Sequence, residues 1–232
     1  WSEPVDSASL RAVQAGFGLV IVVEALRYLI FGWVQRYYVE PPFHFTTVGF
    51  SWLRPLGETG MIVLFVGIGL CGVAMMWGFA TRIAAAVFTM AFGSVFLMDQ
   101  AYYQNHLYLV LIFGLFFVVA DIHAGRSARR WMLDLARFQV AVVYIFGGIA
   151  KLNYDWLRGE PMTSWMAIRA DWPVLGPLLG MPSTGLVMAW SGMLLDLFIV
   201  PFLMWSRTRR FAFGAVLVFH GFNAIVFKIG VF

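Results

Sequence analysis

The sequence predicts an all-α integral membrane protein, a polytopic bundle of about seven transmembrane helices with a cytoplasmic N-terminus. Of its 232 residues, 61% are hydrophobic and only 12% are charged, and the mean hydropathy is +0.81. Soluble domains have about 25% charged residues, so this chain lacks the polar surface that a water-soluble globule needs. Apolar runs of bilayer-spanning length recur along it. We expect one transmembrane domain over residues 1–232, with both ends incomplete, because the sequence starts at Trp1 and stops inside an apolar run.

Short turns and two long loops separate the apolar runs. The expected spans are residues 10–31, 61–79, 83–98, 106–120, 138–150, 184–205, and 211 to the end. The fifth can start earlier, as an amphipathic helix from Trp131. The long loops, 32–60 and 152–182, are rich in proline and tryptophan, which favours irregular structure at the membrane interface. A short surface helix is expected near residues 164–170.

The arginines indicate how the bundle is oriented. Seven alternating spans place nine basic residues beside the N-terminus and in the turns on its side of the membrane, against five on the other side. The nine are Arg11, Arg82, Arg126, Arg129, Arg130, Arg137, Arg207, Arg209 and Arg210, and the five are Arg36, Arg54, Lys151, Arg158 and Arg169. Because cytoplasmic loops carry the excess of basic residues, the N-terminal side is predicted to be cytoplasmic. We expect the arginine-rich turns to contact anionic lipid.

Lys151 is the most informative polar residue. The chain has only two lysines, Lys151 and Lys228, among its 16 basic residues. Lys151 ends the fifth span on the outer side, where a lysine often extends along the helix to the interface. Gly147 and Gly148, one turn earlier, favour close helix packing around it. Burial disfavours the charged ammonium, so a buried Lys151 can act as a general base near neutral pH.

Six further polar residues lie at helix starts or within spans. Asn105 and His106 open the fourth span on the outer side, at the depth of Lys151. In one interpretation Asn105 caps the helix and His106 is a local hydrogen-bond partner; in the other, both residues orient a ring oxygen near the lysine. Asp196 and His220 lie mid-span in the last two helices and are expected to pair as a structural polar clasp. In the first span, Glu24 and Arg27 share one face, as a neutralising pair or as a substrate contact.

Several functional classes find no support in the sequence. A net charge of +4 does not indicate nucleic acid as a partner. The four histidines fall on different elements, and no P-loop or HExxH motif is present, so we expect no metal or nucleotide site. The single Cys71 excludes a disulfide within this chain.

Two segments carry a resemblance to a known family. Residues 144–156, with Lys151 and the Asp155–Trp156 pair, and residues 105–109, with Asn105, His106 and Tyr108, are similar to the vitamin K-dependent gamma-glutamyl carboxylases and to bacterial membrane proteins with an HTTM domain. A weaker match joins residues 192–197 to a later segment that contains His220 and Asn223.

The resemblance implies a specific chemistry. In the carboxylases, reduced vitamin K and O₂ generate a strong base that removes a γ-proton from a glutamate, to which CO₂ then adds. On this model Lys151 deprotonates the hydroquinone, while Asn105 and His106 polarise its oxygens. Tyr108, Trp156, His220 and Asn223 are the expected cofactor-binding residues, for reduced vitamin K or another quinol without a metal. A dry site at the outer face would protect the base from water.

Ala150 stands where the animal carboxylase has a second lysine, and the large lumenal region that grips the substrate is absent from these residues. Substrate recognition therefore does not transfer. The alternative is a non-catalytic transmembrane subunit of a larger complex, holding quinone or lipid; a third is a small quinone-linked redox bundle. The expected partners are membrane lipid, quinone, and a protein substrate or a larger membrane complex. The expected location is the bacterial inner membrane, with the site on the periplasmic side.

Overall fold

The computed structural model describes residues 3–120, 122 and 127–227 and confirms the all-α prediction. In this part of the chain, strand β1 (Pro4–Val5) pairs antiparallel with β2 (Ala128–Arg129) in a two-residue ladder. All the long elements of the described residues are helices. The chain divides into two compact units, residues 1–134 and 135–231. Each unit is described by itself below.

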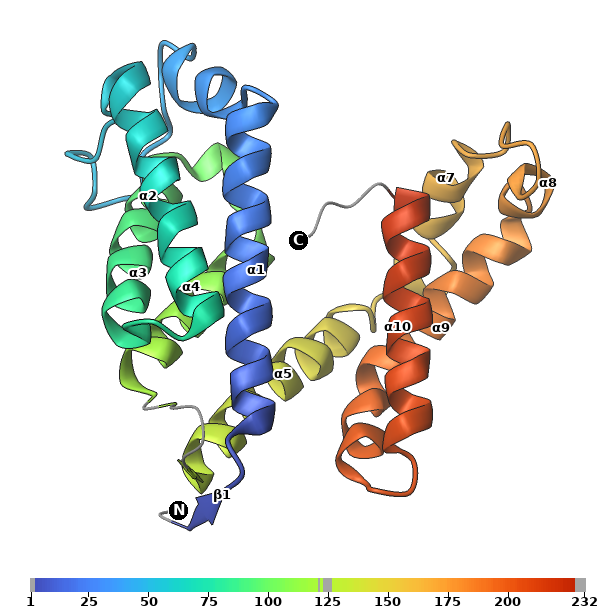
Figure 1. Cartoon of the computed structure of the whole chain (residues 1–232). Helices are drawn as coiled ribbons and strands as arrows, with labels where there is room; N and C mark the ends of the chain where they lie inside the picture. Colours follow the sequence, from blue (N-terminus) through green and yellow to red (C-terminus); the bar gives the residue numbers. More distant parts are fainter. Residues whose placement is uncertain (1–2, 121, 123–126, 228–232) are drawn as a thin grey trace. The chain divides into compact units, whose positions relative to one another are not determined.

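The first unit is built from four apolar helices that lie side by side (Figure 1). They are α1 (Ala8–Ile30), α2 (Gly57–Trp77), α3 (Thr81–Met98) and α4 (Asn105–Val119). The ring of Phe17 on α1 lies 5.8 Å from that of Phe88 on α3 and 5.3 Å from that of Phe117 on α4, so the core closes between the first and last helices. Aromatic burial of this kind is a large apolar contribution to packing.

Small residues bring α1 and α2 into direct backbone contact. A Cβ added to Gly18 would lie 2.6 Å from the backbone nitrogen of Met76, and one added to Gly72 would lie 2.8 Å from the carbonyl oxygen of Gly18. The fully buried Gln14 donates from Nε2 to the Met75 carbonyl at 2.8 Å. Glycine contacts and interhelical hydrogen bonds are the usual adhesive between helices in a membrane.

The first long loop is irregular near its proline pair, as predicted, but begins with a π-helix, η1 (Gln35–Val39). It docks on the end of α3, just before the short helix η2 (Gln100–Tyr102). The buried Asp99 carboxylate lies 3.0 Å from Nδ1 of His44 and accepts a hydrogen bond from the Phe45 amide at 3.3 Å. Burial among aromatic rings raises the pKa of Tyr38 well above its ordinary value.

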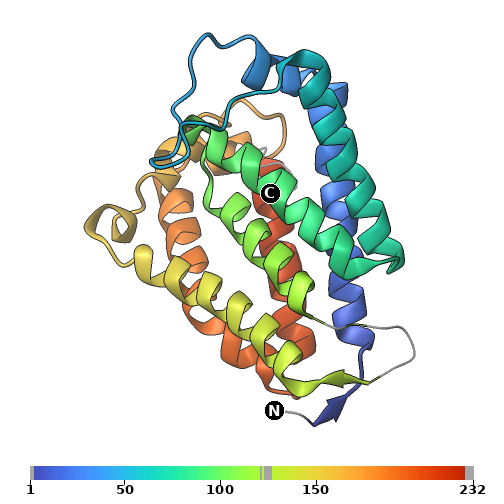
Figure 2. The ribbon, with the colours of Figure 1, turned by 90° about the vertical axis from the view of Figure 1, so that its left-hand side faces the viewer.

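The second unit contains most of α5 (Arg130–Ala150) and the whole of two further long helices, α9 (Pro182–Met204) and α10 (Arg209–Phe227). Helix α5 crosses α9 (Figure 2), and α9 packs along α10. The second long loop folds into three short helices, α6 (Tyr154–Leu157), α7 (Met162–Ala167) and α8 (Gly176–Leu179), that pack on α9. The sequence predicted one of these, near residues 164–170.

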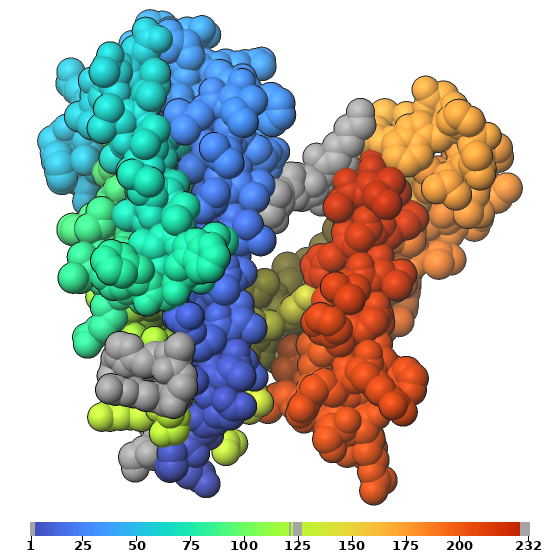
Figure 3. Space-filling view, viewed as in Figure 1, coloured from blue at the N-terminus to red at the C-terminus, as the bar shows by residue number. Residues whose placement is uncertain are grey.

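Six described helices are long and apolar enough to cross a membrane: α1, α2, α3, α5, α9 and α10. The remaining predicted span, the fourth, corresponds to α4, an apolar helix of 15 residues. Such a helix is about 22 Å long, shorter than the roughly 30 Å hydrocarbon core. The space-filling view shows α10 forming much of one face of the second unit (Figure 3), and its Phe211, Phe213 and Val218 are all more than half exposed. Such apolar faces suit contact with lipid, and the protein is an integral, multi-pass membrane protein.

Candidate functional site

Lys151 immediately follows the last residue of α5, where the chain leaves the helix by a tight turn. Its amide donates to the Gly148 carbonyl at 3.1 Å. The expected close packing at Gly148 is present: an added Cβ would lie 2.7 Å from Cγ of Leu197 and 2.9 Å from its backbone nitrogen. Glycine therefore lets the backbones of α5 and α9 meet one turn before the lysine.

The Lys151 ammonium turns back along α5 and bonds to Asp196 of α9. Nζ lies 2.6 Å from Oδ2 of Asp196 and also donates to the Gly147 carbonyl at 3.1 Å. The two side chains are 22% and 13% exposed. A lysine that extended along the helix to the outer interface would point the other way, so this lysine belongs to an ion pair inside the bundle. Ionisable residues within membrane helices typically pair with each other in this manner.

Trp156 completes the immediate surroundings of the ammonium. Nζ of Lys151 lies 5.3 Å from the centre of the Trp156 ring, within the range of a cation–π contact. The ring is positioned by two bonds: Asn153 caps α6 by accepting from the Trp156 amide at 3.0 Å, and the indole Nε1 donates to the Ala189 carbonyl at 2.8 Å. The structure thus brings together Lys151 and Trp156, two of the residues singled out from the sequence.

His220 pairs with Tyr144 rather than with Asp196, so the predicted clasp between Asp196 and His220 is wrong. The Tyr144 hydroxyl lies 2.9 Å from Nε2 of His220. Tyr144 precedes Lys151 by seven residues, two helical turns, so the two side chains leave the same face of α5 and its continuation. Asn223, three residues after His220, has a buried Oδ1 for which the described part of the chain supplies no hydrogen-bond partner.

Asn105, His106 and Tyr108 lie at the beginning of α4, in the first unit. Asn105 is the first residue of that helix and not its cap: the cap position is Gln104, without a capping side-chain bond, so the predicted capping role is wrong. His106 is half-buried, and the Tyr108 ring lies 6.5 Å from that of Phe96. Their common depth with Lys151 stays a prediction from topology.

The residues missed by sequence reasoning are Tyr144 and the true partner of Lys151. Asp196 is the only acidic residue of α9, and Tyr144, Gly148 and Lys151 recur at helical spacing, so the signals were present but did not specify the pairing. The predicted pairing of Arg27 with Glu24 on α1 is confirmed. Within the described residues, no group of three or more His, Cys, Asp or Glu side chains is arranged to hold a metal ion.

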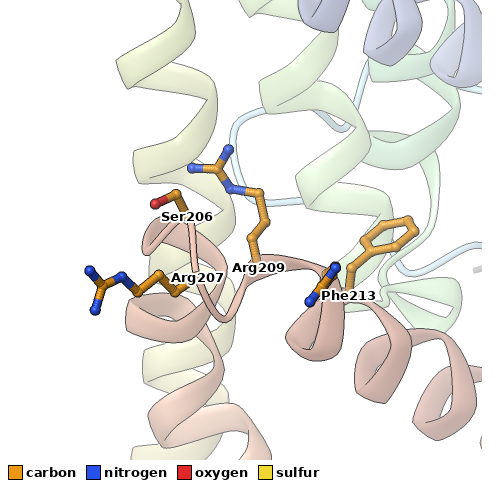
Figure 4. Close-up of a pocket in the computed structure, with 5 residues that line it drawn as sticks. Ser206, Arg207, Arg209 and Phe213 are labelled. Carbon is orange, nitrogen blue, oxygen red and sulfur yellow. The ribbon is translucent and has the colours of Figure 1, made fainter.

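A separate basic hollow lies beyond the C-terminal end of α9, at the turn into α10 (Figure 4). It has a volume of about 690 Å³ and is lined by Ser206, Arg207, Arg209, Arg210 and Phe213. Arg209 caps α9, since its Nε donates to the Leu203 carbonyl at 2.9 Å. No carboxylate in the described residues pairs with the three arginines, and the sequence has no acidic residue after Asp196. The turn thus presents uncompensated positive charge.

The comparison with family models identifies the chain's relatives. The model of the HTTM domain matches residues 2–232. The chain belongs to the HTTM-domain family. The match spans both compact units and includes Lys151, Asp196 and the Asn105–His106 pair. No solved structure matches this HTTM-domain protein.

Proposed function

We propose that this HTTM-domain protein is a quinol-dependent membrane enzyme of the vitamin K-dependent carboxylase type, in which Lys151 receives a proton from a hydroxyl group of a lipid-soluble hydroquinone. The observation that carries the proposal is the Lys151–Asp196 pair, with Nζ 2.6 Å from Oδ2 and beside the ring of Trp156. Within a membrane helix, an ionisable residue is a functional-site candidate by default.

The groups around Lys151 suit a hydroquinone. Such a ligand presents a flat aromatic ring and two hydroxyl groups, and it reaches the site from the lipid. Trp156 offers an aromatic face, and the Lys151–Asp196 pair can accept a proton. On a separate helix, α10, Asn223 has a buried acceptor oxygen that lacks a partner among the described residues, and we propose it as a further ligand of the hydroquinone. When bound, reduced vitamin K would supply, with O₂, the strong base needed to deprotonate a glutamate.

The protein's own part in such a reaction is to hold the proton and exclude water. Helix α5 packs on α9 at Gly148, and this packing covers most of the Lys151 side chain, which is 22% exposed. In a water-poor site the positive charge of Lys151 stabilises a neighbouring oxyanion more strongly than it would in water. We assign the polarising roles on the hydroquinone oxygens to Asn105 and His106, as the family resemblance implies.

The decisive assay incubates the purified protein with vitamin K hydroquinone and O₂ and measures the epoxide by chromatography. Lys151→Ala should lower epoxidation at least about 100-fold, the lower end of the usual contribution of a general base. Lys151→Arg should be as inactive, because a guanidinium keeps the charge but does not release its proton. Arg158→Ala is the matched control, since this cation of the same outer loop contacts Tyr154 instead, and the variant should retain activity.

Equal epoxidation by wild type and Lys151→Ala would refute the assigned role of Lys151. No turnover by the wild type, together with a partner that co-purifies at fixed stoichiometry, would indicate a non-catalytic membrane subunit. Incorporation of labelled CO₂ into a glutamate-containing peptide tests the later carboxylation step. The protein bearing that glutamate is the partner that this proposal requires.

We further propose that the protein lies in a bacterial inner membrane with Lys151 on the periplasmic side; the nine-to-five bias in basic residues supports this orientation. The single Cys71 makes this testable. In a Cys71→Ala background, Asp171→Cys in the second long loop should react with a membrane-impermeant maleimide in intact spheroplasts. Thr208→Cys, in the basic turn, should react only after lysis. The reverse pattern would invert the topology.

A further inference from the structure

The hydrogen bond between Lys151 and Asp196 engages the amino group that the proposed function uses as a base. The ammonium has three N–H donors, of which one is directed to Oδ2 at 2.6 Å and one to the Gly147 carbonyl at 3.1 Å. Only the neutral amine accepts a proton. The ammonium that Asp196 holds must therefore lose a proton before Lys151 can act as a base.

The pair can exist in two forms that differ in the position of one proton. In the first, Nζ carries three protons and Asp196 is a carboxylate; in the second, the proton has moved to Oδ2, leaving an amine and a carboxylic acid. Burial narrows the free-energy gap between them, because a low-dielectric environment penalises the ionic form. Both side chains are mostly buried, at 22% and 13% exposure. The carboxyl group is therefore suited to take up the proton that the lysine must release.

We infer that Asp196 is the positioning residue of this site: it fixes Nζ at the contact between α5 and α9 and sets the protonation state of Lys151. Its role in turnover rests on the proposed function, whereas its effect on the lysine does not. In turnover, an Nζ–H bond breaks and an Oδ2–H bond forms. The hydroxyl O–H bond then breaks and a new Nζ–H bond forms. In the net reaction, the hydroxyl group of the hydroquinone becomes an oxyanion and the Asp196 carboxylate becomes a carboxylic acid. The Lys151 ammonium is restored beside the oxyanion, and no electron is transferred.

Other titratable groups lie on the elements around this pair. Tyr144 of α5 interacts electrostatically with Asp196 and is hydrogen-bonded to His220 of α10. Helix α6 contributes Tyr154 and Asp155 beside Trp156, and both are exposed. A Tyr144→Phe variant therefore serves as a control that removes the bond to His220 while leaving Lys151 and Asp196 in place.

The test uses the full chain and makes Lys151 its only lysine. With Lys228→Arg, reductive methylation with ¹³C-formaldehyde labels one side chain, apart from the distinguishable terminal amine. The dimethylated lysine keeps one N–H for Asp196, and its ¹³C resonance reports protonation as pH is varied. In the Asp196→Asn variant, the titration midpoint should fall by about one to three pH units, the usual effect of losing an opposite charge. Asp196→Glu keeps a carboxylate and should titrate near the parent, and Tyr144→Phe should as well.

Identical midpoints in the parent and Asp196→Asn would overturn the inference. If Asp196→Asn does not fold, a large midpoint change in Asp196→Glu would overturn it equally, because the carboxylate is retained there. The epoxidation assay separates this inference from the proposed function. A shifted midpoint in a protein without turnover supports the role of Asp196 and rejects the enzymatic proposal. Turnover together with an unshifted midpoint supports the enzymatic proposal and rejects the role of Asp196.

Discussion

Gly148→Ala tests the helix contact on which the lysine site depends. The added Cβ would lie 2.7 Å from Cγ of Leu197 and 2.9 Å from its backbone nitrogen, whereas ordinary contact begins at 3.4 Å. The side chain of Leu197 can rotate, but its backbone nitrogen cannot, so α5 and α9 must separate. The backbone contact alone requires a displacement of about 0.5 Å, from 3.4 − 2.9 Å.

The cost of such overpacking is about 1–3 kcal/mol. For a protein of this size, 1 kcal/mol corresponds to a change in Tm of about 2–4 °C, so Gly148→Ala should lower Tm by about 2–12 °C. A shift of 0.5 Å along the line joining Lys151 and Asp196 would lengthen the 2.6 Å bond to about 3.1 Å and weaken it.

The assay is thermal unfolding of the purified protein in detergent, followed by tryptophan fluorescence. Gly214→Ala on α10 is the matched control, because an added Cβ there meets nothing within 4 Å. In a helix interior, alanine is favoured over glycine by up to about 1 kcal/mol, so the control should unfold at the same or a higher temperature. If Gly148→Ala behaved like the control, the close approach of α5 and α9 would be refuted.

Three further outcomes are expected. Trp156→Phe keeps an aromatic ring but loses the indole bond to the Ala189 carbonyl; it should destabilise the protein by about 1 kcal/mol in the same unfolding assay, and no change would show that the bond contributes nothing. Burial raises the pKa of Tyr38, so its contribution to stability is fully present below the pKa of an unfolded tyrosine, about 10, and is lost as pH rises above that value. The Tyr38→Phe variant should therefore show a smaller fall in Tm above pH 10 than the wild type. An equally steep fall in both proteins would contradict the burial of this phenol. The double variant Arg207→Gln/Arg210→Gln should weaken binding of a fluorescent anionic phospholipid by about 1 kcal/mol per arginine, whereas the corresponding lysine double variant should bind normally; equal binding by the glutamine variant would exclude this turn as a lipid contact.

Much of the fold follows from local sequence properties. Apolar runs of bilayer length predicted the long helices to within a few residues: the sixth span was expected at 184–205 and the helix is Pro182–Met204. The proline-rich loops were expected to be irregular, although their short helices α6 and α8 were not, because one-turn helices depend on packing more than on periodicity. The Gly147–Gly148 pair predicted close helix packing, because only a residue without a side chain lets two backbones meet.

What the sequence determined, then, was that a lysine ends an apolar helix beside two glycines and that a carboxylate lies in a later span. Only the tertiary structure decided that these two groups are partners and that His220 bonds to Tyr144 instead. The physical reason is that residues 45 positions apart meet according to the crossing angle and the relative rotation of α5 and α9. The hydropathy pattern determines the approximate depth of a residue in the membrane, but helix packing determines which face of each helix contacts which neighbouring helix.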